Sequence, residues 1–135
     1  MTEKIRVIVA DDEQLVLAAL VKMVNSRVDM TAVGEAASGP QAVRCAQPQR
    51  ADVVLMDVRM PGGDGITATA QLRALPQTPQ VLVLTTFDLD DHVSAALDAG
   101  ASGFMFKDTE PERRFHAIRA FAAGEGMLAP TVTGA

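Results

Sequence analysis

The stretch Ala51-Asp-Val-Val-Leu-Met-Asp57-Val-Arg-Met-Pro61-Gly-Gly-Asp-Gly65 carries an apolar run into a single carboxylate and then into a glycine-rich turn. The run from Val53 to Met56 predicts a buried strand, because every position in it is apolar. Asp57 would then stand at the C-terminal tip of that strand. Open α/β sheets bind their ligands at this edge, so Asp57 is the first candidate functional residue.

The composition indicates one globular domain. The chain has 135 residues, of which 48% are hydrophobic, and it contains no Trp or Tyr, so the core must be mainly aliphatic. No apolar run is long enough to span a bilayer, and the segment from Met1 to Arg6 lacks the apolar region of a signal peptide. The single Cys45 cannot form an internal disulfide. We therefore expect a cytoplasmic protein that does not associate with membranes.

The charge balance bears on possible partners. The formal net charge is −5, and the sequence contains no basic stripe of the kind that grips nucleic acid. This segment is therefore not expected to bind DNA by itself. An acidic balance suits a cationic ligand such as a metal ion.

Hydrophobic periodicity predicts five strands that alternate with five helices, the pattern of an α/β fold with a parallel sheet covered on both faces. The expected strands are residues 5–10, 31–36, 52–57, 80–85 and 103–107. The expected helices are residues 14–25, about 38–47, 66–75, 89–99 and about 111–123. Pro48 is expected to stop the second helix, and the spacing from Thr109 to Glu112 is that of a capping box for the last one.

Two of these helices have apolar residues outside their main stripe. The first helix has its stripe at positions 15, 16, 19, 20, 23 and 24, which leaves Leu17 and Val21 on the outer face. The last helix should turn positions 115, 118 and 122 inward, which leaves Phe121 outside. Such outward apolar residues are either a contact surface or scattered surface hydrophobics without a role.

Five polar residues fall at predicted strand tips: Asp11, Asp12, Asp57, Thr85 and Lys107. Taken singly, each has an ordinary explanation as a helix cap, a turn residue or a solvated side chain. The tips of parallel strands lie at one edge, however, so we expect these side chains to converge.

Three converging carboxylates repel one another unless a cation neutralises them. Mg²⁺ (or Mn²⁺) prefers oxygen ligands and keeps several waters, so one or two carboxylates and a substrate oxygen suffice. A carboxylate in such a site can act as a nucleophile and take up a phosphoryl group. The strand-tip residues therefore predict a metal-assisted phosphoryl-acceptor site.

The sequence resembles the receiver domain of two-component response regulators. The matching segments are Val9-Ala-Asp11-Asp12, Leu55-Met-Asp57-Val-Arg-Met-Pro61, Leu84-Thr85-Thr86 and Gly103-Phe104-Met-Phe-Lys107. Other segments, such as Val-Leu-Thr-Thr-Phe-Asp-Leu-Asp-Asp and Gly-Ala-Ser-Gly-Phe, look most like the NarL/FixJ branch, whose receivers precede a LuxR-type helix-turn-helix. The resemblance implies a flavodoxin-like (CheY-like) doubly wound sheet with strand order 2-1-3-4-5.

The resemblance also implies a role for each matching residue. Asp57 would be the phosphoacceptor, Asp12 would ligate Mg²⁺ directly, and Asp11 would do so mainly through water. The backbone carbonyl of Arg59 would be a further metal ligand. Thr85 and Lys107 would contact the phosphoryl group, and Phe104 would be the aromatic switch residue that packs inward when Thr85 moves. The family often has Tyr at Phe104 and Pro at Asp108, so the switch here has only packing available and a cis peptide after Lys107 is not expected.

The resemblance implies partners and domain boundaries as well. A sensor histidine kinase would phosphorylate the receiver domain, which comprises residues 1–124. Residues 125–135 would begin a linker to an effector domain. From the outward apolar residues of the first and last helices, which neighbour each other in this strand order, we expect phosphorylation to promote a homodimer with Leu17, Val21 and Phe121 at its face. DNA would be bound only through the C-terminal domain, for transcription regulation.

Four alternatives are open at this stage. The chain could be a stand-alone receiver that acts through protein–protein contacts, or a receiver that no longer uses phosphate. A flavin carrier of the same fold would need a phosphate loop after the first strand, where this sequence has Asp11-Asp12-Glu13. An aspartyl-phosphate hydrolase usually has a second Asp two residues after the nucleophile, where this sequence has Arg59. We therefore expect no enzyme activity beyond slow self-phosphorylation and self-dephosphorylation.

Overall fold

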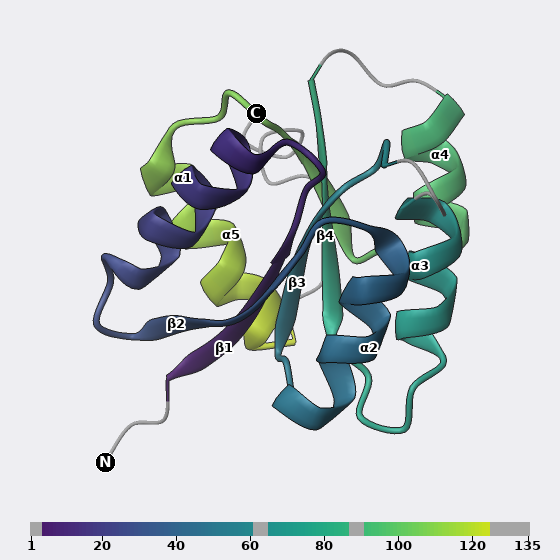
Figure 1. Cartoon of the computed structure of the whole chain (residues 1–135), viewed down its shortest axis with the longest axis horizontal. Coiled ribbons are helices and arrows are strands. Elements are labelled where there is room, and N and C mark those ends of the chain that lie inside the picture. The colour runs from purple at the N-terminus through teal and green to yellow at the C-terminus, as the bar shows by residue number, and fades with distance from the viewer. Residues whose placement is uncertain (1–3, 61–64, 87–90, 125–135) are drawn as a thin grey trace.

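Five parallel strands form the centre of the computed structural model, which describes residues 4–60, 65–86 and 91–124. The strands lie in the order β2-β1-β3-β4-β5, as the sequence predicted (Figure 1). Their bounds are β1 Ile5–Ala10, β2 Met30–Ala36, β3 Val53–Asp57, β4 Gln80–Thr85 and β5 Gly103–Phe106. The central strand β3 is buried along its whole length, so its position is fixed by neighbours on all sides.

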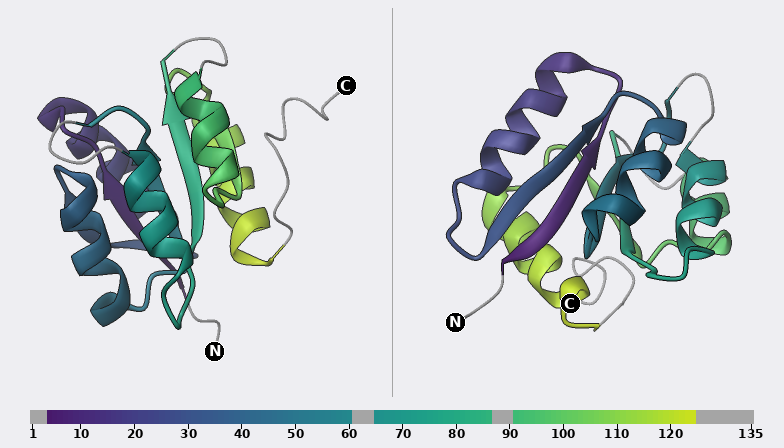
Figure 2. Two further views of the ribbon diagram at one scale, coloured as in Figure 1. Left: turned by 90° about the vertical axis from the view of Figure 1, so that its right-hand side faces the viewer. Right: turned by 60° about the horizontal axis from the view of Figure 1, so that its bottom comes forward.

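Helices cover both faces of the sheet (Figure 2). Their bounds are α1 Gln14–Asn25, α2 Gly39–Gln49, α3 Gly65–Arg73, α4 Asp91–Asp98 and α5 Pro111–Ala122. Helices α1 and α5 share one core with one set of strand side chains, and α2, α3 and α4 share a second core with the other set. The two cores follow from the alternation of side chains along each strand. In β1, for example, Val7 and Val9 face the first core and Ile8 faces the second.

The buried face of α5 differs from the expected one. Phe121, which was expected outside, has an exposed fraction of 0% and packs in the core beside Phe115 and Ile118. Ala122 was expected inside and is only half-buried. The buried arc of this helix is therefore rotated toward Ile118 and Phe121, and Phe121 cannot belong to a surface contact.

The buried face of α1 is also rotated from the expected one. Leu15 was expected in the inward stripe and is 87% exposed, whereas Leu20 and Val24 are buried. Leu17 and Val21 are half-buried against the core rather than on an outer face. Leu15 is thus a large apolar side chain that α1 presents to solvent.

Two helix ends differ from the predictions. Pro48 lies inside α2, which continues to Gln49 and closes when Arg50 adopts a left-handed conformation with a φ of 52°. Pro48 has no backbone N–H, so the last turn of α2 loses one hydrogen bond. At α5 the capping box is absent: the N-cap is Glu110 with no side-chain cap bond, and Pro111 begins the helix.

No helix in the described part of the chain is both long and apolar enough to cross a membrane.

Candidate functional site

The C-terminal tip of β1 delivers the first two carboxylates. Asp11 is completely buried, and its backbone N–H donates to the carbonyl of Ala36 at the end of β2 (3.0 Å). Its side-chain Oδ1 accepts from the backbone N–H of Glu13 (2.9 Å), which turns the chain into α1. Asp12 is exposed. One of the two carboxylates is therefore fixed by the fold, and the other remains open to solvent.

The tip of β3 delivers Asp57, which is 6% exposed. The ladder to β4 continues past it, because the N–H of Val58 donates to the carbonyl of Leu84 (3.1 Å). Asp57 Oδ1 accepts from the backbone N–H of Arg59 at 3.2 Å. These backbone bonds hold the carboxylate at a fixed height above the sheet, as the sequence pattern predicted.

Gly65 is a supporting residue to which the sequence reasoning gave no role. A Cβ at this first position of α3 would lie 2.7 Å from the carbonyl oxygen of Asp57 and 2.9 Å from Cα of Val58. The start of α3 therefore packs directly on the backbone that carries Asp57, which only glycine permits. The signal in the sequence is the last glycine of the Pro-Gly-Gly-Asp-Gly turn.

Lys107 joins the carboxylates. Its backbone N–H donates to the carbonyl of Thr85 (2.7 Å), which extends the pairing of β4 and β5 beyond the last residue of β5. Its ammonium lies 3.0 Å from Asp11 Oδ2 and 3.1 Å from Asp57 Oδ2. It also lies 3.6 Å from Glu13 Oε1, a contact that the sequence did not indicate. One cation thus faces several carboxylates.

This cluster has more negative than positive charge. Burial raises the pKa of Asp57, while the N–H of Arg59 and the ammonium of Lys107 act in the opposite direction without cancelling it. For Lys107, burial acts to lower the pKa, but the carboxylates of Asp11 and Asp57 outweigh burial and raise it. The lysine therefore stays protonated, and the carboxylates remain short of positive charge.

The donor set fits a hard divalent cation. One carboxylate oxygen from each of Asp11, Asp12 and Asp57 can be chosen so that all three lie within 4.8 Å of one another. Asp11 Oδ2 is buried and has no hydrogen bond of acceptable geometry, although the ammonium of Lys107 is close to it. Three oxygen donors of this kind are typical of a Mg²⁺ site.

The remaining predicted residues line or support the same edge. A cavity of about 220 Å³ opens there, lined by Asp12, Glu13, Asp57, Val58, Arg59, Thr85, Thr86 and Lys107. Thr85 is buried and pairs across the ladder with Phe106. Phe104 does not line the cavity; it is buried in the core and makes an edge-on contact with Phe106, with ring centroids 6.2 Å apart. No cis peptide occurs in the described segments, in accord with the expectation for Lys107 and Asp108.

Comparison with known proteins agrees with this geometry. Residues 7–119 match the family described as response regulator receiver domain. The uncharacterized transcriptional regulatory protein YxjL of Bacillus subtilis is 44% identical over 134 residues, which are 98% of this chain and 61% of that protein. The nitrate/nitrite response regulator NarL of Escherichia coli is 30% identical, over 97% of this chain and 61% of that protein.

Solved structures give the same result. The receiver domain of the putative response regulator NarL from Mycobacterium tuberculosis superposes with a TM-score of 0.85 and 34% identity, over 90% of this chain and 98% of that chain. This chain spans just over 60% of the curated relatives that it matches, so it corresponds to the receiver part of longer regulators.

Proposed function

The chain belongs to the receiver-domain family of two-component response regulators, and from that premise we propose that Asp57 accepts a phosphoryl group from a sensor histidine kinase. Receiver domains are regulatory phosphoacceptors rather than catalytic enzymes. The observation that supports Asp57 as the acceptor is its place in the carboxylate cluster: it is buried at the tip of β3, with Lys107 Nζ 3.1 Å away and Asp11 and Asp12 beside it.

The transfer forms one bond and breaks another. A carboxylate oxygen of Asp57 attacks the phosphorus of the kinase phosphohistidine, and the P–N bond breaks as the imidazole nitrogen takes up a proton. Asp11, Asp12, Asp57 and the backbone carbonyl of Arg59 would hold Mg²⁺ or Mn²⁺, which neutralises charge on the phosphoryl oxygens. Lys107 is already within ion-pair distance of Asp57, so its ammonium can follow the phosphoryl oxygens as they acquire charge.

The switch residues are Thr85 and Phe104. The hydroxyl of Thr85, which lines the same cavity as Asp57, would donate to a phosphoryl oxygen. Movement of β4 toward the site would then shift a two-state equilibrium of the β4–α4–β5 face. Phe104 is already buried and has no hydroxyl, so only its packing against Phe106 can change.

The kinase is proposed to dock on α1, beside the acceptor. Leu15 is 87% exposed, and with Ala19 it lines an apolar pocket of about 270 Å³ that also reaches Lys107. An exposed apolar residue this close to the reacting group suits a partner that must deliver a phosphohistidine to Asp57.

The homodimer remains a prediction for the α1–α5 face. These helices are neighbours, because Arg27, just past the end of α1, pairs with Glu112 of α5 at 2.6 Å. Leu17 and Val21 are only half-buried, but Phe121 lies in the core and contributes nothing to the surface. A dimer here therefore depends on the exposed edge of α1 more than on α5.

The link to transcription rests on the longer relatives. Residues 1–124 would form the receiver domain and residues 125–135 would begin a linker to a DNA-binding domain. In this proposal the chain works in the cytoplasm and touches DNA only through that domain.

The direct test is phosphorylation with Mg²⁺ and acetyl phosphate, followed by intact mass measurement. We expect one phosphoryl addition, which is lost when the metal is chelated and in the variant Asp57→Asn. Asp52→Asn is a matched control, because Asp52 immediately precedes β3, at the end of the strand opposite Asp57. Phosphoryl addition to the Asp57→Asn variant would show that another residue is the acceptor.

A further inference from the structure

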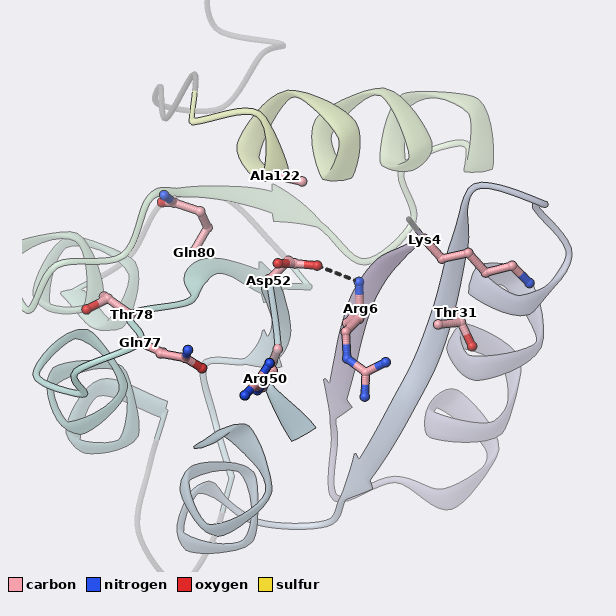
Figure 3. A pocket seen from close by; sticks show the side chains of 10 residues that line it. Lys4, Arg6, Thr31, Arg50, Asp52, Gln77, Thr78, Gln80 and Ala122 are labelled. Atoms are coloured by element: carbon pink, nitrogen blue, oxygen red, sulfur yellow. Dashed lines mark hydrogen bonds between the residues drawn. The ribbon is translucent and has the colours of Figure 1, made fainter. Parts of the chain in front are cut away.

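A second cavity, of about 720 Å³, opens at the N-terminal edge of the sheet, opposite the carboxylate site (Figure 3). Its walls come from the beginnings of β1, β2 and β4, from the segments that lead from α2 to β3 and from α3 to β4, and from the end of α5. We call it the basal pocket. Asp52 in its wall immediately precedes β3 and Asp57 ends that strand, so extended chain separates the two sites by about 17 Å.

The basal pocket carries positive charge in an acidic protein. Among the described residues that line it, Lys4, Arg6 and Arg50 are basic and Asp52 is the one carboxylate. Asp52 Oδ2 already accepts from the backbone N–H of Arg6 at 2.8 Å. Arg6 Nε donates to the carbonyl of Gln49 at 2.7 Å, which fixes the guanidinium. No ion pair satisfies these three cations in the described part of the chain.

Arg50 occupies a backbone position that favours glycine. It has a φ of 52° and closes α2 in a left-handed conformation, and it is the only described non-glycine residue with positive φ. Glycine adopts this conformation without steric cost and is the usual residue at such helix ends. An arginine therefore occupies a position whose left-handed backbone conformation is unfavourable for it. This is expected when the arginine side chain has a function apart from closing the helix.

Neutral polar groups complete the wall. Gln77, Thr78 and Gln80 lie on one side of Asp52, and Lys4, Arg6 and Thr31 lie on the other (Figure 3). The side-chain oxygen of Gln80 accepts from the hydroxyl of Ser102, which leaves the Gln80 amide NH₂ as a donor. None of the residues that line the pocket is aromatic.

We propose that the basal pocket binds a sugar phosphate or a similar phosphorylated polyol. The guanidinium groups of Arg6 and Arg50 match the phosphate, because arginine binds such oxygens with paired N–H donors, and the exposed Lys4 adds positive charge to the pocket. The amides and hydroxyls across the pocket match sugar hydroxyls. A nucleotide fits less well, because no aromatic ring is present to stack on a base. The cavity has the volume of ordinary small-molecule sites.

The test is an NMR titration of the ¹⁵N-labelled 135-residue chain without Mg²⁺, with glucose 6-phosphate as the probe. We expect the largest shifts at the backbone amides of Asp52 and Gln80, and weaker binding at higher salt. Glucose, inorganic phosphate and AMP serve as comparison probes. Each should bind more weakly, because glucose lacks the anion, phosphate lacks the hydroxyls and AMP carries a base that finds no stacking partner.

Variants separate binding from folding. Arg50→Gln should weaken binding by about tenfold or more, as expected for the loss of a charge-assisted contact. Arg44→Gln removes the same charge from the exposed surface of α2, outside the pocket, and should leave affinity unchanged. Arg50→Gly should melt no lower than wild type, because glycine suits the positive φ, and should still bind poorly.

Several results would overturn the proposal. These are the absence of shifts at millimolar glucose 6-phosphate, shifts centred on Asp12 and Thr85 instead, or equal losses in Arg50→Gln and Arg44→Gln. Inorganic phosphate or AMP binding as tightly as glucose 6-phosphate would refute the assignment to a phosphorylated sugar. None of these measurements depends on phosphorylation of Asp57.

Discussion

Replacing Gly65 by alanine should disturb both the fold and the acceptor site. The added Cβ would lie 2.7 Å from the carbonyl oxygen of Asp57, 2.9 Å from Cα of Val58 and 3.1 Å from the carbonyl oxygen of Val58. Carbon atoms pack without repulsion at about 3.5 Å, so the first turn of α3 must move away from the tip of β3 by roughly half an ångström. All three contacts are with backbone, which cannot rotate away as a side chain can.

The magnitude follows from the cost of overpacking. An extra methyl group in a close-packed contact costs about 1–3 kcal/mol, and the rigid backbone contacts place Gly65→Ala near the middle, at about 2 kcal/mol. For a domain of this length, each kcal/mol lowers the melting temperature by about 4 °C. We therefore expect a decrease of about 8 °C, together with slower phosphorylation because the carbonyl of Asp57 moves with the strand tip.

Thermal unfolding and the rate of phosphorylation by acetyl phosphate are the two measurements. Gly34→Ala is the matched control, because the three atoms nearest its new Cβ all belong to side chains, the nearest being Ile8 Cγ1 at 3.3 Å. A Gly65→Ala variant that melts within about 2 °C of the wild type and reacts at the same rate would refute the reasoning.

Four further perturbations test separate parts of the structure. Asp57→Asn should raise the melting temperature of the metal-free protein at neutral pH. Burial raises the pKa of Asp57, so the stability that this carboxyl contributes is present below its ordinary pKa and is lost as pH rises through its raised pKa. Saturating Mg²⁺, at about a hundredfold excess over its dissociation constant, should add about 2.7 kcal/mol to the wild type, and a similar gain in Asp57→Asn would argue against this residue as a ligand. Asp29→Asn should cost about 0.5 kcal/mol at neutral pH, because the Arg119 side chain holds the pKa of Asp29 below its usual range. That stability is present above the ordinary pKa and disappears as pH falls through the lowered one, so equal melting temperatures of variant and wild type at neutral pH would contradict it. Leu15→Gln should leave the melting temperature unchanged and slow phosphotransfer from the kinase by about tenfold; slowing of the acetyl phosphate reaction by the same factor would exclude a docking role.

The strand tips were predictable from the sequence for a simple reason. Strands β1, β3 and β4 are apolar almost throughout and end where the chain turns polar, so the last residue of each strand is visible in the sequence. Parallel pairing then brings Asp11, Asp57 and Thr85 to one edge without further information. Strand order also followed, although its source was the family resemblance rather than the pattern of apolar residues.

The buried faces of the helices were harder to predict. A stripe of apolar residues gives the buried direction of a helix only approximately. In α5, Phe121 follows Ile118 by three positions, so it lies on the side of the helix that the stripe left uncertain, and packing against the sheet decided its burial. In α1, Leu15 continues the stripe by periodicity, but it lies in the first turn, beyond the reach of the core. Its exposure could be found only from the structure.

Contacts that support the functional sites were the second kind of feature that the sequence did not reveal. The close approach of α3 to the backbone of Asp57 requires Gly65 and depends on how the helix packs on the strand. Its only sign in the sequence is the glycine itself. The left-handed conformation of Arg50 leaves no trace at all, because arginine is not the residue that this conformation usually selects. Both features came from packing rather than from local pattern.

The charges at the two ends of the sheet have opposite sign, which polarises the molecule along its strands. The acidic end carries Asp11, Asp12, Glu13 and Asp57 against Arg59 and Lys107, and the basic end carries Lys4, Arg6 and Arg50 against Asp52. A small anionic phosphodonor is therefore repelled from the end where it must react, whereas a divalent cation is attracted to it. The charge distribution thus favours one order of arrival, in which the cation reaches the acidic end first and the phosphodonor follows.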